Sequence, residues 1–122
     1  SLKYLIKNDF STFKNQKSLF AMTAHIIYES IDPINTATHS KKMITIIRNK
    51  IKYKNIIISD DISMKALKFS VEKNTVKAFK AGCNIVLHCN GRMSEMNMVA
   101  KNSPKLDSFL MKKTSEFYKL TT

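Results

Sequence analysis

Three short apolar runs punctuate the chain, and segments with a helical repeat of apolar residues separate them. The runs occupy residues 19–24, 55–58 and 85–87, and their length suits strands buried on both faces. Helical spacing predicts helices over 2–14, 41–52, 71–81, 93–100 and from Ser103 to the C-terminus. Strands that alternate with helices in this way favour an α/β fold with parallel strands and right-handed crossovers.

Polar residues that favour helix ends set the expected boundaries. Ser40 and Ser70 are predicted N-caps, because each stands directly before a helical segment. Gly82 is predicted to end the helix over 71–81, where a left-handed backbone is usual. Ser103-Pro104 predicts the start of the last helix, because proline is favoured in a first turn.

Each predicted strand ends in polar residues: His25, the pair Asp60-Asp61, and His88. Active sites of parallel α/β folds lie at this edge of the sheet. The residues alone leave Asp60 open between a site residue and a cap, and they favour a cap or a loop hydrogen bond for Asp61. A hydrogen-bonded structural role is favoured for His25 and His88, since lone histidines at strand ends usually have one.

Composition indicates one globular domain, over residues 1–122, with 43% hydrophobic and 25% charged residues. The absence of a long apolar stretch argues against a membrane span, and no signal peptide is evident at the N-terminus. The start at Ser1 suggests that a segment lies upstream. Two cysteines are too few for a disulfide framework, so a reducing compartment, the cytoplasm, is expected.

Neither a metal site nor a cofactor is expected. Cys83, His88 and Cys89 lack the paired spacing that zinc sites use. The chain also has no glycine-rich phosphate loop.

The net charge of +12 admits two interpretations. One is an anionic partner, such as nucleic acid or anionic lipid, and the other is a bias in the base composition of the genome. The chain has 19 Lys but 2 Arg, and the lysines are scattered rather than gathered on one stripe. Because arginine is preferred for reading phosphates and bases, compositional bias is favoured, and neither a nucleic acid nor a membrane is expected as a partner.

Three motifs together resemble the β-N-acetylhexosaminidases of glycoside hydrolase family three. The motifs are Ala-Met-Thr-Ala-His-Ile-Ile-Tyr at 21–28 with its following loop to Ser40, Ile-Ile-Ile-Ser-Asp-Asp-Ile-Ser-Met at 56–64, and Ala-Gly-Cys-Asn-Ile-Val-Leu-His-Cys-Asn at 81–90. They occur in the family's order and at about its spacing. The resemblance implies a TIM-type (β/α)8 barrel, of which this chain would be the C-terminal three βα units.

The resemblance also implies an activity and a site. The family hydrolyses terminal β-linked N-acetylglucosamine with retention, and in Gram-negative bacteria it acts on cytoplasmic muropeptides during cell-wall recycling. The first Asp of its Ser-Asp-Asp motif is the nucleophile, which maps onto Asp60. His25, Asp61, Ser63 and Met64 then become candidate supporting residues, with Met64 expected to pack under the loop.

Several family residues have no counterpart in this chain. The family's general acid/base, a His assisted by an Asp, precedes the first matched motif, as do its Lys-His-Phe-Pro-Gly-His-Gly motif and other sugar-binding residues. Lys52-Tyr53-Lys54 stands where the family usually has Gly-Phe. The chain alone is therefore expected to be inactive, and an N-terminal fragment that completes the barrel is an expected partner. The alternatives are a non-catalytic remnant that binds sugar or a partner chain, and a basic nucleic-acid-binding domain.

Overall fold

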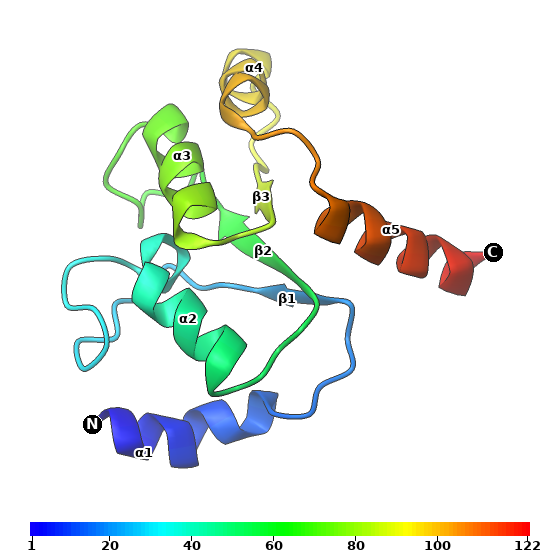
Figure 1. Cartoon of the computed structure of the whole chain (residues 1–122). Coiled ribbons are helices and arrows are strands. Elements are labelled where there is room, and N and C mark those ends of the chain that lie inside the picture. Colours follow the sequence, from blue (N-terminus) through cyan, green and yellow to red (C-terminus); the bar gives the residue numbers. More distant parts are fainter.

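A three-stranded parallel sheet forms the centre of the molecule, and the computed structural model describes all 122 residues (Figure 1). The strands are β1 (Phe20–Met22), β2 (Ile56–Asp61) and β3 (Ile85–Leu87), in the spatial order β1-β2-β3. Phe20 pairs with Ile56, and both neighbouring pairs of strands are parallel. The predicted α/β class with parallel strands is confirmed.

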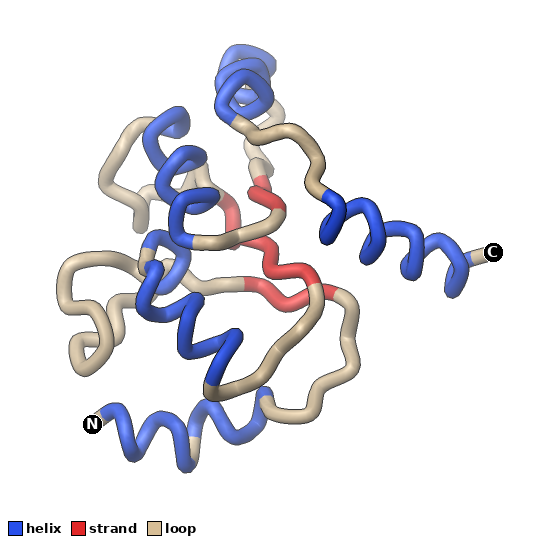
Figure 2. The backbone as a smooth tube through the Cα atoms, in the orientation of Figure 1, coloured by secondary structure: helices blue, strands red, loops and turns tan.

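Helices connect the strands and extend beyond the sheet (Figure 2). The helical elements are α1 (Leu2–Lys7), the 3₁₀ segments η1 (Asp9–Phe13) and η2 (Ala37–His39), α2 (Lys41–Asn49), α3 (Val71–Ala81), α4 (Met93–Asn102) and α5 (Ser108–Thr121). The crossovers α2 and α3 lie on one side of the sheet, and α5 lies on the other (Figure 1). No helix combines the length and apolar character that a membrane crossing requires.

The core lies between the sheet and its crossover helices. Ile57 of β2 and Ala78 of α3 are almost fully buried there, and Ile44 of α2 is 4% exposed. Gly82 has a φ of +120°, and a Cβ at this position would lie 2.8 Å from the Ile44 Cγ2 atom. Glycine is therefore required both by the backbone conformation and by the close approach of α2 to the end of α3.

The predicted caps of the two crossover helices are confirmed. The Ser40 hydroxyl oxygen accepts a hydrogen bond from Met43 N–H, and the Ser70 hydroxyl oxygen accepts one from Lys73 N–H. The helix over 71–81 and the strand over 85–87 have the predicted bounds. Local capping hydrogen bonds thus set where the two crossover helices, α2 and α3, begin.

Two helix predictions at the ends of the chain are wrong in their bounds. The segment 2–14 is not one helix, because it breaks at Asn8, whose side-chain amide donates to Tyr4 C=O, and continues as η1. Such local side-chain bonds compete with a regular helix. The last helix does not begin at Ser103-Pro104. It begins at Ser108, because Asp107 Oδ1 accepts a hydrogen bond from Leu110 N–H at 2.7 Å and so forms the cap.

Other boundaries differ by a few residues. The first strand ends at Met22 rather than residue 24, and the helix predicted over 41–52 ends at Asn49. The segment predicted over 93–100 extends to Asn102. The second strand ends in Asp60 and Asp61, as predicted.

The expectation that all three strands are buried on both faces is also wrong. Met22 of β1 is 60% exposed, and no residue of β3 is fully buried. Only part of the face opposite α2 and α3 is covered, where Phe117 of α5 packs edge-on against Phe20 with 5.5 Å between ring centroids. The outer strands therefore keep apolar surface that the fold of this chain leaves uncovered.

A buried histidine lies beside this core, in the segment that leads into α2. His39 is 9% exposed, and its ring centroid lies 6.4 Å from that of Phe69. Burial, with the charges of Lys77 and His25, lowers the pKa of His39 to about 4 from the usual 6.5. His39 is therefore neutral in the folded protein at pH 7, as in the unfolded chain.

We expect folding stability to fall as the pH is lowered from 7 to 5. In this window the unfolded chain binds a proton at His39 and the folded chain does not, which lowers the free energy of unfolding by about 2 kcal/mol. Urea unfolding followed by circular dichroism at the two pH values measures this change. The variant His39→Gln removes the titrating group, so an equally large drop in that variant would contradict the assignment.

Candidate active site

The C-terminal edge of the sheet gathers polar groups from all three strands. Asp60 and Asp61 end β2, His25 follows β1, and Cys89 follows β3. Hydrogen bonds from His25 and from the Cys89 backbone both reach Asp61. The structure thus brings together His25, Asp60 and Asp61, but at the end of β3 the Cys89 backbone, and not the predicted His88 side chain, hydrogen-bonds to Asp61.

A β-bulge in β2 shapes this edge. Ile58 pairs with Ile85 and Asp61 pairs with Leu87, so three steps along β2 match two along β3. The extra residue falls in the stretch Ser59–Asp60. Ser59 is fully buried, and its hydroxyl oxygen accepts a hydrogen bond from Leu87 N–H at 3.0 Å. The side chain of Ser59 thereby satisfies a donor at the point where the ladder is irregular.

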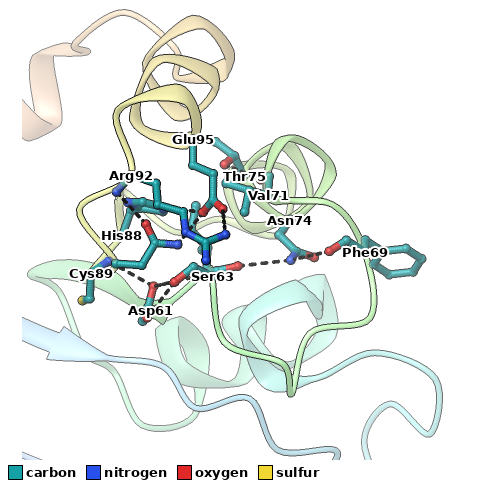
Figure 3. Close-up of polar contacts among 12 residues, drawn as sticks. Asp61, Ser63, Phe69, Val71, Asn74, Thr75, His88, Cys89, Arg92 and Glu95 are labelled. Atoms are coloured by element: carbon teal, nitrogen blue, oxygen red, sulfur yellow. Dashed lines mark hydrogen bonds and ion pairs between the residues drawn. The ribbon is translucent and has the colours of Figure 1, made fainter.

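Asp61 is the acceptor on which this edge converges. Its Oδ1 accepts hydrogen bonds from Ser63 N–H at 3.0 Å, from the Ser63 hydroxyl at 2.8 Å and from Cys89 N–H at 3.2 Å (Figure 3). Partial burial alone would raise the pKa of Asp61, but these hydrogen bonds and the nearby His88 outweigh it and lower the pKa. Asp61 is thus held as a carboxylate that joins β2 to the loop after β3.

Asp60 has a different environment from that of its neighbour. Its Oδ1 accepts a hydrogen bond from Asp61 N–H at 2.8 Å, and its Oδ2 accepts none from the chain. The residue is half-buried. One carboxylate oxygen is therefore held by the backbone, and the other is free to meet a ligand.

His25 contacts both β2 and the loop before α2. Its Nε2 lies 2.8 Å from the Asp61 carbonyl oxygen, and its Nδ1 lies 2.9 Å from Thr38 Oγ1. Thr38 is fully buried and lies within hydrogen-bond distance of Thr23 Oγ1, at 2.8 Å. The ring is thus held on both sides.

The two remaining candidate residues differ. Ser63 donates its hydroxyl to Asp61 and belongs to the hydrogen-bonded edge. The Met64 side chain is 44% exposed, so the expectation that it packs under the loop is wrong. Its backbone N–H donates to Asp61 C=O at 3.2 Å, which closes a tight turn after β2.

His88 makes no hydrogen bond to Asp60 or Asp61 and bonds instead to Glu95 of α4. Its Nε2 lies 2.8 Å from Glu95 Oε2, and its buried Nδ1 has no hydrogen-bond partner (Figure 3). Asn90 donates its side-chain amide to the same Glu95 oxygen. The hydrogen bonds from His88 and Asn90 are the main reason that the pKa of Glu95 is lowered. His88 thus anchors the start of α4.

The two cysteines occupy separate environments. Cys83 is 4% exposed, and burial raises its pKa to about 12. Cys89 is exposed, and desolvation together with the charges of Asp61 and Asp60 raises its pKa as well. Both groups are therefore thiols at neutral pH. No three His, Cys, Asp or Glu side chains lie close enough to hold a metal ion.

Sequence reasoning missed Ser59, Thr23, Thr38 and the Cys89 amide as parts of this edge. A serine before two aspartates gives no signal of a bulge, because a bulge depends on the register of the partner strand. The two threonines are separated by 15 positions, and only the fold brings their hydroxyls together. The Cys89 contribution is a backbone group, which residue identity does not reveal.

Ser59→Ala is expected to destabilise the fold by about 1–3 kcal/mol, because the part-buried Leu87 N–H loses its acceptor. Chemical denaturation followed by circular dichroism measures the loss. The matched control is Ser115→Ala on the exposed surface of α5, whose hydroxyl bonds only Met111 C=O within its own helix. A change within about 0.5 kcal/mol is expected there. Equal effects of both variants would show that the Ser59 hydroxyl does not stabilise the bulge.

Comparison with known proteins places this geometry in a family. Residues 3–114 match the family model described as the glycosyl hydrolase family 3 N terminal domain. A beta-hexosaminidase of Idiomarina loihiensis is 31% identical over 108 residues, 85% of this chain and 33% of its own length. One of Nitrosomonas eutropha is 41% identical over 71 residues, 57% of this chain and 20% of its own length.

Solved structures agree. The beta-N-acetylglucosaminidase from Thermotoga maritima superposes with a TM-score of 0.67 at 32% identity, over 82% of this chain and 24% of that chain. The chain thus spans no more than about a third of the relatives named here. Because residues 3–114, nearly the whole chain, match the family model, this chain belongs to glycoside hydrolase family three.

Proposed function

We propose that this chain supplies the nucleophile of a retaining β-N-acetylhexosaminidase, and that Asp60 is that nucleophile. The observation that carries the proposal is the state of the Asp60 carboxylate. One oxygen is held by Asp61 N–H at 2.8 Å, the other accepts no hydrogen bond from the chain, and the residue lies at the C-terminal edge of a parallel sheet. The matched beta-hexosaminidases point to the same reaction class.

Asp60 takes the role of the second carboxylate of a retaining glycosidase, which is the nucleophile. Oδ2 attacks the anomeric carbon of a terminal β-linked N-acetylglucosamine, and the bond to the leaving oxygen breaks as an acid gives that oxygen a proton. Water then cleaves the glycosyl ester and regenerates Asp60. His25, Asp61 and Ser63 support this role through the hydrogen bonds at the edge.

The acid and the sugar-binding residues come from outside this chain in the proposal. We assign β1, β2 and β3, with their helices, to the C-terminal three βα units of a (β/α)8 barrel, so the chain is a partial catalytic domain. β1 hydrogen-bonds only to β2, so its other edge is free to pair with a strand. An apolar groove of about 550 Å3 lies along β1. The groove is lined in part by Phe10, Phe13, Phe20, Ala21, Met22 and Tyr53.

An N-terminal segment that adds the preceding strand would cover this groove and complete the site. The natural substrate that we propose is a muropeptide or a related glycoside with N-acetylglucosamine at its non-reducing end. The setting would be the bacterial cytoplasm, during recycling of the cell wall. The named relatives are beta-hexosaminidases of bacteria, which supports this setting.

The isolated chain should not hydrolyse an aryl N-acetylglucosaminide. Loss of a general acid alone costs about 10²–10⁴ in rate, and the sugar-binding residues are missing as well. A chimera in which residues 3–114 replace the matching third of the Idiomarina loihiensis relative should regain turnover. Release of the aryl alcohol measures both. Turnover by the isolated chain that disappears in Asp60→Asn would contradict the need for upstream residues. A folded but inactive chimera would favour a non-catalytic remnant.

A slow fluorinated N-acetylglucosaminyl donor should form a covalent adduct on Asp60 in the chimera. Retention requires a glycosyl-enzyme, and fluorine slows its hydrolysis enough for mass spectrometry of the peptides. The adduct should be absent in Asp60→Asn, whereas Asp61→Asn should still form it at a lower rate. A label on Asp61, or one that persists in Asp60→Asn, would assign the nucleophile elsewhere.

A further inference from the structure

His25 reaches from the end of β1 to the last residue of β2. Its Nε2 lies 2.8 Å from the carbonyl oxygen of Asp61. A carbonyl oxygen only accepts hydrogen bonds, so Nε2 carries a proton and donates it. This contact holds the backbone carbonyl of Asp61, so the Asp61 carboxylate remains available to Ser63 and to the Cys89 N–H.

The ring itself is held from behind by buried hydroxyls. Nδ1 lies 2.9 Å from Thr38 Oγ1, which also lies 2.8 Å from Thr23 Oγ1 and 3.2 Å from Ala24 O. Thr38 is fully buried, and Thr23 is 6% exposed. The ring plane is therefore set by a rigid part of the core, and the direction of the Nε2 donor is set with it.

The residue whose carbonyl His25 holds also bonds to Asp60 through its N–H. The N–H of Asp61 donates to Asp60 Oδ1 at 2.8 Å, and the carbonyl of Asp61 receives the bond from His25. These two groups belong to adjacent peptide units that meet at the Asp61 Cα, so holding the carbonyl, which also accepts from Met64 N–H, restricts the backbone rotation that would move the N–H away from Asp60. Residues 59 and 60 lie at the bulge, where irregular pairing with β3 constrains the backbone less than in a regular strand.

We propose that His25 is a positioning residue, which aims the Asp60 carboxylate by clamping the Asp61 backbone. This inference rests on the proposed role of Asp60 as nucleophile for its catalytic meaning, but the clamp itself is a structural statement. His25 holds the carboxylate in its attacking geometry, and small losses of such alignment cost large factors in rate. The effect therefore appears in kcat rather than in KM.

A matched pair of variants separates the two sides of the ring. In His25→Gln the side-chain amide nitrogen takes the place of Nε2 and keeps the donor to Asp61 C=O. In His25→Asn the side-chain amide reaches only as far as Nδ1, where its oxygen can accept from the Thr38 hydroxyl, so the contact with Thr38 is kept and the donor to Asp61 is lost. Both variants remove the imidazole, so they share any loss that the ring's packing causes.

The first measurement is made on the chain as it stands, by NMR. We expect the 15N spectrum of His25 to show Nε2 as a protonated nitrogen, and a bare Nε2 would overturn the clamp without any variant. Hydrogen exchange of the Asp61 amide should be about tenfold faster in His25→Asn, because the Asp61 carbonyl loses the bond from His25 and the backbone that aims the amide at Asp60 becomes freer to open. It should stay within about twofold of the original chain in His25→Gln. Equal exchange in the two variants would overturn the clamp.

The second measurement uses the chimera, and it separates the clamp from the proposed function. We expect His25→Asn to lower kcat about tenfold or more with little change in KM, and His25→Gln to restore most of it. Equal kcat in the two variants would overturn the positioning role. If the exchange data show the clamp but the chimera with His25 is inactive, the proposed function fails and the clamp stands.

Discussion

Asp61 holds together three segments that are far apart in the sequence. Its carbonyl accepts from His25 after β1, its carboxylate accepts from the Cys89 amide after β3, and Ser63 closes the loop beneath it. Each hydrogen bond is of ordinary strength, but together they hold the end of β2 in a single conformation. The neighbouring Asp60 accepts only one hydrogen bond, from Asp61 N–H, and keeps a free oxygen. The two adjacent aspartates thus differ in role: the Asp61 carboxylate is taken up by hydrogen bonds within the chain, and one oxygen of Asp60 is left available.

The opposite edge of the sheet is fixed by a cation rather than by an anion. Arg48 Nη1 donates to the carbonyls of Tyr53 and Asn55 at 3.0 and 2.7 Å, and its Nη2 donates to Asn84 Oδ1 at 2.9 Å. The same Asn84 oxygen accepts from Ile57 N–H, so the guanidinium joins the approaches to β2 and β3. A guanidinium suits this cluster of oxygen acceptors because its five N–H donors have a fixed geometry, which a lysine ammonium lacks. With both edges fixed, the short strands between them act as rigid supports.

Much of this arrangement could be predicted from the sequence, where the determinants are local. Ser70 and Gly82 mark α3 because a cap and a left-handed turn depend on residues within one turn of the helix. The grouping of Asp60, Asp61 and His25 followed from the rule that parallel strands end at one edge. The break at Asn8 and the start of α5 at Asp107 were missed, because there polar side chains compete with a periodic apolar pattern. The bulge at Ser59–Asp60 depends on the register against β3, which no local pattern encodes.

Under the proposed function, the position of the chemistry also explains why this chain would need additional strands. Asp60 gains its geometry from contacts within 20–91, whereas an acid that protonates a leaving group must approach from the other side of the sugar. The free edge of β1, with exposed Met22 and the groove beside it, is where such a group would be brought close. Apolar surface that a partial barrel leaves open is also surface that an added strand would bury, so closing the fold and completing the site would be the same event. The proposed nucleophile would thus be preorganised in this chain, and catalysis would require the strand that pairs with β1.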